Sequence, residues 1–406
     1  MASRVREFHL PMTLVFAGSA LLSLLLCSAL AMGGVELGLN LSLVGLFIGL
    51  LLPGGIEIRN RSGRTRRVLV LDYRLHQFGH AVARGVMRTL NSDKRRWEVT
   101  YKGPGSEATH GAIEFQLREI QSAIIEDFDA IVLIPAGSDE RLWHGLAIAI
   151  KNRAFTVVVD TKPPNRVFRD VGIESPRFVS ADYAETGVLV GGMLSEWLLT
   201  DPQRKCILWT GPYGSWPGEE RSRNVIFELA RRNLLDRTVL QPISSWAPDQ
   251  GRCSHALECI EKLGGKVAVY TADDENAVAL HLATLVERPA LRRDMYIVGC
   301  NGTSDDWGRV PSLDLRAVDG TVDILAEEQG VQAAMLMVKE RNGLLHPSER
   351  SVYIRPHTIL AEAQGKGLGK AEAVTGVSEA TGGLLTGSPM MEGPFEPSPA
   401  VSGSAS

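Results

Sequence analysis

This chain of 406 residues has few cysteines and little net charge, and each of these shortages excludes a class of protein. Five cysteines are too few for a disulfide-stapled scaffold of this length. A formal net charge of −4 provides no basic field for displacing counterions from phosphates, which argues against a non-specific nucleic-acid binder. Hydrophobic residues make up 44% of the chain, enough for the cores of two or three domains, so disorder throughout is also excluded.

Motifs for catalysis, metal binding and DNA binding are missing as well. The chain has no G-x-S-x-G elbow, no H-E-x-x-H pair and no Walker loop. His76 and His80 would share one helix face, but no third ligand with metal-site spacing accompanies them. Apolar segments occupy the place where a repressor would carry its helix-turn-helix. The sequence therefore predicts no enzyme, no metal, no cofactor and no nucleic-acid partner.

Charge is absent from two long stretches near the start of the chain, Pro11–Val35 and Leu37–Ile56. Each is long enough to cross a bilayer, because a helix of about 20 residues spans the hydrocarbon core. The first stretch could instead be a secretory signal, since two arginines precede it and residues 29–31 form an A-x-A cleavage pattern. We expect one or two transmembrane helices within residues 1–56, in contact with membrane lipid, followed by a basic linker over residues 57–67.

Beyond Arg67, short β-branched runs alternate with amphipathic stretches, a pattern typical of a parallel sheet covered by helices. The expected strands are Val68–Asp72, Glu98–Tyr101, Ala130–Ile134, Thr156–Asp160, Phe178–Ser180, Cys206–Thr210, Val239–Ile243, Val267–Tyr270, Tyr296–Gly299, Leu315–Val318 and Val352–Ile354. The expected helices are Gln77–Leu90, Ala112–Glu126, Glu140–Asn152, Glu185–Leu199, Glu219–Asn233, Ser254–Leu263, Glu275–Val286 and Ile324–Arg341. So many strands favour an α/β fold with two lobes. The composition of residues 363–406 predicts a disordered tail.

Six strand-end motifs follow one another in a fixed order. They are Asp129–Asp139, Phe155–Asp160, Val179–Asp182 with Glu185–Gly187, Cys206–Gly211 with Glu219–Arg223, Val269–Asp274 with Ala277, and Ile297–Gly302. This order resembles the type I periplasmic binding proteins, in particular their sugar-binding, ribose-binding-like group. The resemblance covers residues 68–360 and is carried by the whole series, because any single motif is weak.

The resemblance implies two Rossmann-like lobes, joined by a three-stranded hinge, that close on a ligand. Residues 68–362 would form this bilobed domain. Lobe one would be residues 68–181 plus about 323–349, and lobe two residues 182–322 plus about 350–360. Ligands of open α/β sheets lie at the carboxyl ends of the strands, so the polar residues that end the strands are the candidate site.

Asp160 and Arg221 are the first candidates that the resemblance identifies. A carboxylate such as Asp160 can accept two hydroxyl hydrogens from a vicinal diol, although a helix cap or a loop acid is the plain alternative. The planar guanidinium of Arg221 can donate to ring or hydroxyl oxygens. A surface arginine is the alternative there, with Arg223 as its nearest rival.

The remaining candidates are two aromatic residues and three polar ones. Trp246 and Phe78 match positions where the family stacks rings on a sugar, unless they belong to the core. Asp273 stands where the family often has Asn, and Asn301 where it usually has Asp. Asp72, together with Tyr73 and His76, could supply replacement polar contacts.

The chain departs from the family at Ile134, Ala181 and Gly79, where the family often has Asn, Ser and a second aromatic residue. Each departure removes a polar or stacking contact, so a pentose bound in the family's usual way is doubtful.

These patterns predict a membrane-anchored solute-binding protein that captures a sugar-like, polyhydroxylated ligand for an ABC permease. The alternative is a ligand-sensing receptor that signals through a membrane partner. The resemblance places the binding domain on the extracytoplasmic side of the cytoplasmic membrane. Five arginines over residues 59–67 argue for the cytoplasmic side by the positive-inside rule, so the two indications conflict.

Overall fold

The computed structural model describes residues 64–73, 77–93, 96–104, 111–244, 246, 248–302 and 318–360. The predicted membrane segments, most of the basic linker and the predicted tail lie outside these residues, as does His76. Across the described ranges, no helix combines the length and the apolar character that crossing a membrane requires.

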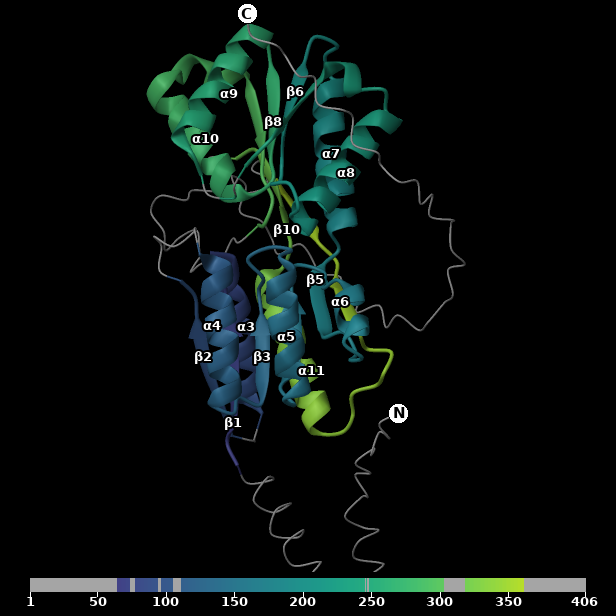
Figure 1. Ribbon diagram of the computed structural model, residues 1–406. Helices are drawn as coiled ribbons and strands as arrows, with labels where there is room; N and C mark the ends of the chain where they lie inside the picture. Colours follow the sequence, from purple (N-terminus) through teal and green to yellow (C-terminus); the bar gives the residue numbers. More distant parts are fainter. Residues whose placement is uncertain are drawn as a thin grey trace, which may run out of the picture. The chain divides into compact units, whose positions relative to one another are not determined.

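Two six-stranded sheets form the framework (Figure 1). The first has the order β11-β5-β4-β3-β1-β2, and all of its strands are parallel. Its strands are β1 (Arg66–Leu71), β2 (Trp97–Lys102), β3 (Ala130–Leu133), β4 (Phe155–Val159), β5 (Arg177–Ala181) and β11 (Ser351–Ile354).

The second sheet has the order β12-β10-β9-β8-β6-β7, and only β12 runs antiparallel to its neighbour. Its strands are β6 (Lys205–Thr210), β7 (Thr238–Pro242), β8 (Val267–Thr271), β9 (Met295–Val298), β10 (Gly320–Asp323) and β12 (His357–Leu360).

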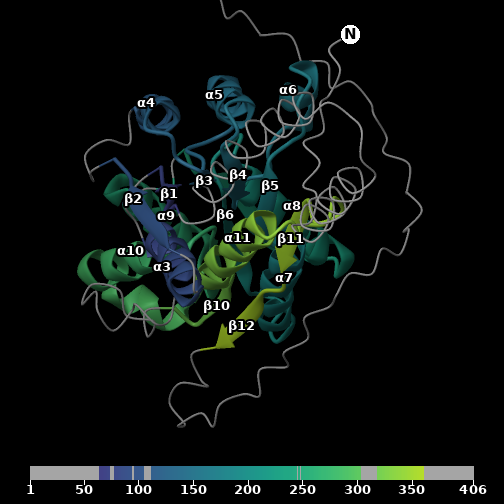
Figure 2. The same cartoon turned by 90° about the horizontal axis from the view of Figure 1, so that it is seen from below.

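Helices cover both faces of each sheet, which explains why the central strands are continuous apolar runs such as Ala130–Leu133. In the first lobe, α3 (Gln77–Ser92) and α11 (Ala326–Arg341) pack on one face, and α4 (Ala112–Ile125), α5 (Glu140–Lys151) and α6 (Asn165–Asp170) on the other (Figure 2). In the second lobe, α7 (Tyr183–Leu199) and α8 (Trp216–Arg231) oppose α9 (Gln250–Leu263) and α10 (Asp274–Glu287). Two short 3-10 helices, η1 (Leu235–Arg237) and η2 (Pro289–Asp294), complete the second lobe.

The chain crosses between the lobes three times, which confirms the predicted two-lobed α/β fold. The first crossing leads from β5 into α7, the second from β10 into α11, and the third from β11 into β12. The third is the shortest, because only Arg355 and Pro356 separate those two strands.

One prediction about the lobes was wrong. The strand around Val352 was assigned to the second lobe, but β11 pairs with β5 in the first sheet, where Val352 is opposite Val179. The reason is the position of α11, which packs on α3 and contacts β4 and β5. The chain therefore leaves α11 at the free edge of the first sheet. Only the unpredicted β12 reaches the second sheet.

Two further differences concern weak strand and helix signals. Of the strand expected at Leu315–Val318, residues 315–317 lie outside the described residues and Val318 is not in a strand. The strand that follows is β10, which begins at Gly320. Its sequence, Gly-Thr-Val-Asp, contains two residues that are depleted in strands. The short helix α6 was also not predicted.

Candidate functional site

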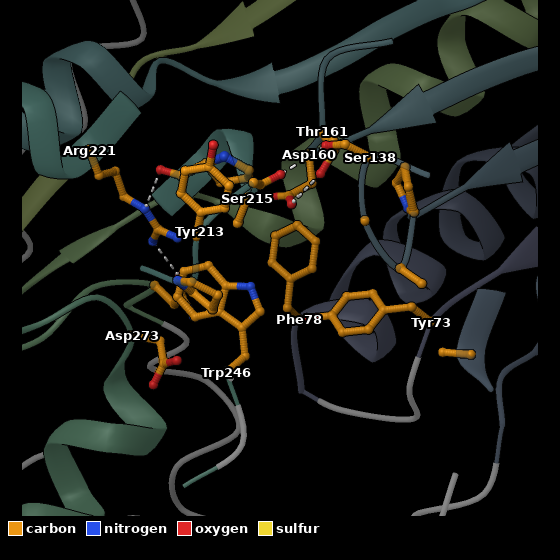
Figure 3. Close-up of a pocket in the computed structure, with 18 of the residues that line it drawn as sticks. Tyr73, Phe78, Ser138, Asp160, Thr161, Tyr213, Ser215, Arg221, Trp246 and Asp273 are labelled. Atoms are coloured by element: carbon orange, nitrogen blue, oxygen red, sulfur yellow. Dashed lines mark hydrogen bonds between the residues drawn. The ribbon is translucent and has the colours of Figure 1, made fainter. Parts of the chain in front are cut away.

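Loops at the carboxyl ends of the strands of both sheets line one cavity of about 390 Å³ (Figure 3). The first lobe contributes residues that follow β1, β3 and β4, and the second lobe contributes residues that follow β6, β7, β8 and β9. This is the place where open parallel sheets hold ligands. Its polar and aromatic lining includes Tyr73, Phe78, Ser138, Asp160, Thr161, Tyr213, Arg221, Trp246, Asp273 and Asn301.

Six of the seven predicted site residues line this cavity, and Asp72 does not. The Asp72 carboxylate is fully buried, where it accepts hydrogen bonds from the Tyr101 hydroxyl at 2.9 Å and from the backbone N–H of Tyr73 at 2.8 Å. A Cβ atom on Gly79 would collide with it. Asp72 thus packs beneath α3, and of the two described members of that predicted cluster Tyr73 lines the cavity.

Asp160 follows β4 with a backbone φ of +75°, a left-handed conformation that non-glycine residues seldom adopt. Its backbone is held on both sides, because its N–H donates to Val179 O at 3.0 Å and its carbonyl accepts from the Ser180 hydroxyl at 3.3 Å. Its carboxylate accepts hydrogen bonds from the hydroxyls of Tyr183 and Thr161. Such over-determined strain is typical of functional sites.

Arg221 lies on α8 and is buried, which excludes the surface arginine considered above. Its Nε donates to Pro217 O at 3.1 Å, and its Nη1 donates to the Cys300 sulfur at 3.0 Å and to Asn301 Oδ1 at 3.2 Å. The guanidinium also lies over the rings of Tyr183 and Trp246, at 4.9 and 5.3 Å from their centroids. Arg223 is exposed and pairs with Glu220.

Asn301 and Asp273 complete the polar side of the second lobe. Asn301 has a φ of +125°, so it is the second strained residue that lines the cavity. Asp273 is buried and caps α10, since its carboxylate accepts from the backbone N–H of Asn276 at 2.7 Å and from the Asn276 side chain.

Aromatic rings line the cavity from both lobes (Figure 3). Phe78 is buried at the start of α3, while Trp246 is half-buried in the loop after β7. Tyr73 and Tyr213 join them, and Tyr213 is 99% exposed.

Sequence reasoning missed the contribution of two loops rich in proline and glycine. The Ser138 hydroxyl, in the loop after β3, donates to Gly214 O at 2.9 Å in the loop after β6, so the two lobes are joined there directly. The available signal was the pair of segments Pro135–Ser138 and Gly211–Ser215, each directly after a buried apolar strand.

The three departures from the family pattern have different explanations. Ile134 and Ala181 are fully buried, and neither lines the cavity. Gly79 leaves room for the Asp72 carboxylate, which an aromatic side chain there would displace.

In the part of the chain that the structure describes, no three acidic, cysteine or histidine side chains are grouped so as to hold a metal ion.

Comparison with known proteins gives matches among solved structures alone. No protein-family model and no curated protein matches the chain. An ABC transporter periplasmic solute-binding protein from Actinobacillus succinogenes with bound D-allose has a TM-score of 0.59 and 17% identity, over 74% of this chain and 99% of that chain. A solute-binding protein from Bacillus halodurans with bound myo-inositol has a TM-score of 0.57 and 16% identity, over 74% and 96%.

The fructose-binding periplasmic domain of a hybrid two-component system is similar as well, with a TM-score of 0.57 and 15% identity over 73% of this chain and 91% of that chain. At such identities the likeness concerns the fold. The chain has the two-lobed fold of the type I periplasmic binding proteins, which its strand-end motifs predicted.

Proposed function

We propose that this chain is a solute-binding protein that captures a sugar or a similar small polyhydroxylated ligand between its two lobes and delivers it to an ABC-type transporter. The observation that carries this proposal is the meeting of the Asp160 carboxylate, the Arg221 guanidinium and four aromatic rings in one cavity at the strand ends of both sheets.

The chemistry of a polyhydroxylated ligand fits these groups. Hydroxyl hydrogens donate to carboxylates such as Asp160, while hydroxyl and ring oxygens accept from Arg221 and Asn301. The apolar faces of a sugar ring pack on aromatic side chains such as Trp246 and Phe78. Binding requires no reaction, because contacts with both lobes shift the equilibrium between their arrangements. The similar structures that carry D-allose and myo-inositol support this ligand class.

The anchor and its side of the membrane are part of the same proposal. The uncharged stretches within residues 1–56 would hold the binding domain at the extracytoplasmic face of the cytoplasmic membrane. Reporter fusions at Glu362 test this arrangement. An active exported reporter is expected, whereas an active cytoplasmic reporter would show that the arginines of the linker decide the orientation instead.

Sensing is the second candidate function, and the likeness to the fructose-binding domain of a two-component system favours it. In that case the same cavity would report ligand occupancy to a membrane signalling partner. Cross-linking of the full chain in its native membrane separates the two functions: a permease partner supports transport, and a kinase partner supports sensing.

A thermal-shift screen of the full chain against sugars, polyols and unrelated solutes tests the ligand class. A solute at 100 times its Kd stabilises the folded protein by about 2.7 kcal/mol. Asp160→Asn should reduce the shift without abolishing it, and Asp139→Asn is the matched control, since Asp139 follows Ser138 without lining the cavity. A shift with another solute class and none with polyols would refute the proposal.

A further inference from the structure

Tyr183 holds a cavity residue of the opposite lobe without lining the cavity itself. It is the first residue of α7, directly after the first crossing, and it is buried. Its phenol donates to Oδ1 of Asp160, in the first lobe. Burial and the neighbouring Asp160 carboxylate raise the pKa of the phenol well above its usual value, so it remains a donor at neutral pH.

The ring of Tyr183 is fixed by the second lobe. The Arg221 guanidinium lies 4.9 Å from its centroid, and the ring of Trp216 meets it edge-on at 5.6 Å. One helical turn further along α7, Gly187 lets the backbone of Arg221 approach closely, because a Cβ there would collide with the Arg221 carbonyl oxygen. Tyr183 and Arg221 are thus held together by the packing of α7 on α8.

We propose that Tyr183 is a positioning residue of this cavity: through one phenol hydroxyl it orients the Asp160 carboxylate for a ligand hydroxyl. The inference rests on the proposed capture of a polyhydroxylated ligand. Tyr183 holds Oδ1 while the Thr161 hydroxyl donates to Oδ2 at 3.4 Å, so the two bonds together fix the plane of the carboxylate and the remaining lone pairs have set directions. A ligand hydroxyl then meets an acceptor that is already oriented.

A second Tyr–Asp pair in the same chain provides the matched control. Tyr101 donates to the buried Asp72 at 2.9 Å, and neither residue lines the cavity. Tyr101→Phe therefore removes the same kind of bond from the first lobe without touching the cavity. Tyr183→Phe removes only the phenol oxygen and retains the ring beside Arg221.

The experiment is calorimetric titration of the full chain with D-allose, myo-inositol, D-fucose, D-arabinose and D-fructose, and then with the monodeoxy analogues of the tightest binder. Removing the ligand hydroxyl that binds Asp160 should raise the Kd about 10–100-fold in the wild type. The same deoxy analogue should bind Asp160→Asn almost as well as the parent sugar does, and this difference identifies the hydroxyl. In Tyr183→Phe we expect that same penalty to fall to about threefold or less, while the penalties at other positions persist.

Each outcome decides the matter. Reduction of that single penalty in Tyr183→Phe, but not in Tyr101→Phe, supports the inference. An unchanged penalty in Tyr183→Phe, or equal loss at every deoxy position, gives Tyr183 a purely structural role and leaves the proposed function standing. Failure of all five compounds to bind the wild type refutes the proposed ligand class, and the inference falls with it.

Discussion

Nη1 of Arg221 lies 3.0 Å from the sulfur of Cys300, so a neutral group holds the buried cation of the cavity. Burial raises the pKa of the Cys300 thiol to about 11, which keeps it protonated at neutral pH. Among the residues that the structure describes, the other two acceptors of Arg221 are a carbonyl and an amide oxygen, and none of the three is a carboxylate. Burying the guanidinium therefore costs desolvation energy that no ion pair with a carboxylate offsets.

Arg221→Met should therefore abolish ligand binding while changing the free energy of unfolding by less than about 2 kcal/mol, because the lost hydrogen bonds are offset by removal of a buried charge. Urea denaturation and the thermal-shift screen measure the two effects. Arg223→Met, on the exposed side of the same helix, is the control and should leave both unchanged. A loss of stability well above 3 kcal/mol would show that Arg221 has a structural role instead.

Gly187 and Gly192 lie on the same helix in opposite surroundings. A Cβ at Gly187 would collide with the Arg221 carbonyl oxygen and lie 2.7 Å from Cβ of Asn224, whereas a Cβ at Gly192 meets nothing within 4 Å. Gly187→Ala should cost about 1–3 kcal/mol by overpacking and should also weaken ligand binding, because α8 carries Arg221. Gly192→Ala should stabilise the protein by about 0.5–1 kcal/mol. Equal unfolding free energies for the two variants would contradict this packing.

Asp274 should make stability fall as pH rises. Burial raises its pKa to about 7, although the Thr321 hydroxyl and the Gly302 N–H, both at 2.7 Å, favour the charged form. An acid that is harder to ionise when folded contributes stability that is complete below about pH 4 and is lost as pH rises through about 7.

Asp274→Asn can retain both contacts, because its amide oxygen can accept from Gly302 and its NH₂ can donate to Thr321. The difference in unfolding free energy between this variant and the wild type should grow in favour of the variant, by an order of a few kcal/mol, between pH 4 and pH 8. Chemical denaturation at several pH values measures it. A constant difference over this range would mean that Asp274 ionises normally.

Glu228 should make stability fall as pH decreases, which is the opposite of the effect of Asp274. Its buried carboxylate accepts from Arg231 and from Arg232, each at 2.8 Å, and the hydrogen bond from Arg231 is the main cause of its lowered pKa. The stability that it contributes is present at neutral pH and is lost as pH falls through that lowered pKa. Glu228→Gln should cost about 1–3 kcal/mol at pH 7 and much less at pH 3. Similar costs at both pH values would contradict the lowered pKa.

Most strands could be predicted because they are buried on both faces, and a continuous apolar run such as the one at β3 or β4 carries its own signal. β10 could not, since its pairing with β9 and β12 stabilises a Gly-Thr-Val-Asp segment that has little strand preference of its own. The lobe of β11 could not be deduced from local sequence either, because the packing of α11 decides which sheet edge the chain reaches.

In the site, too, roles set by local sequence could be predicted, and roles set by contacts between distant segments could not. The family resemblance identified Asp160, Arg221 and Asn301, which all line the cavity. Asp160 and Asn301 lie in segments that follow strands, and a strand delivers such residues to the sheet edge locally, whereas Arg221 lies on α8. Asp72 also ends a strand, but its surroundings depend on Tyr101, which lies 29 residues further along the chain. Tyr183 was overlooked for a similar reason, since the carboxylate that it binds belongs to the other lobe.

The positions of β11 and β12 determine whether a single lobe can be produced as a fragment. β11 completes the edge of one sheet and, after only Arg355 and Pro356, β12 completes the edge of the other. Neither lobe is a continuous piece of chain, so a gene fragment that encodes a single lobe would lack part of that lobe's own core. A newly made chain can complete either sheet only when synthesis has passed α11, so both lobes gain their final strand almost together.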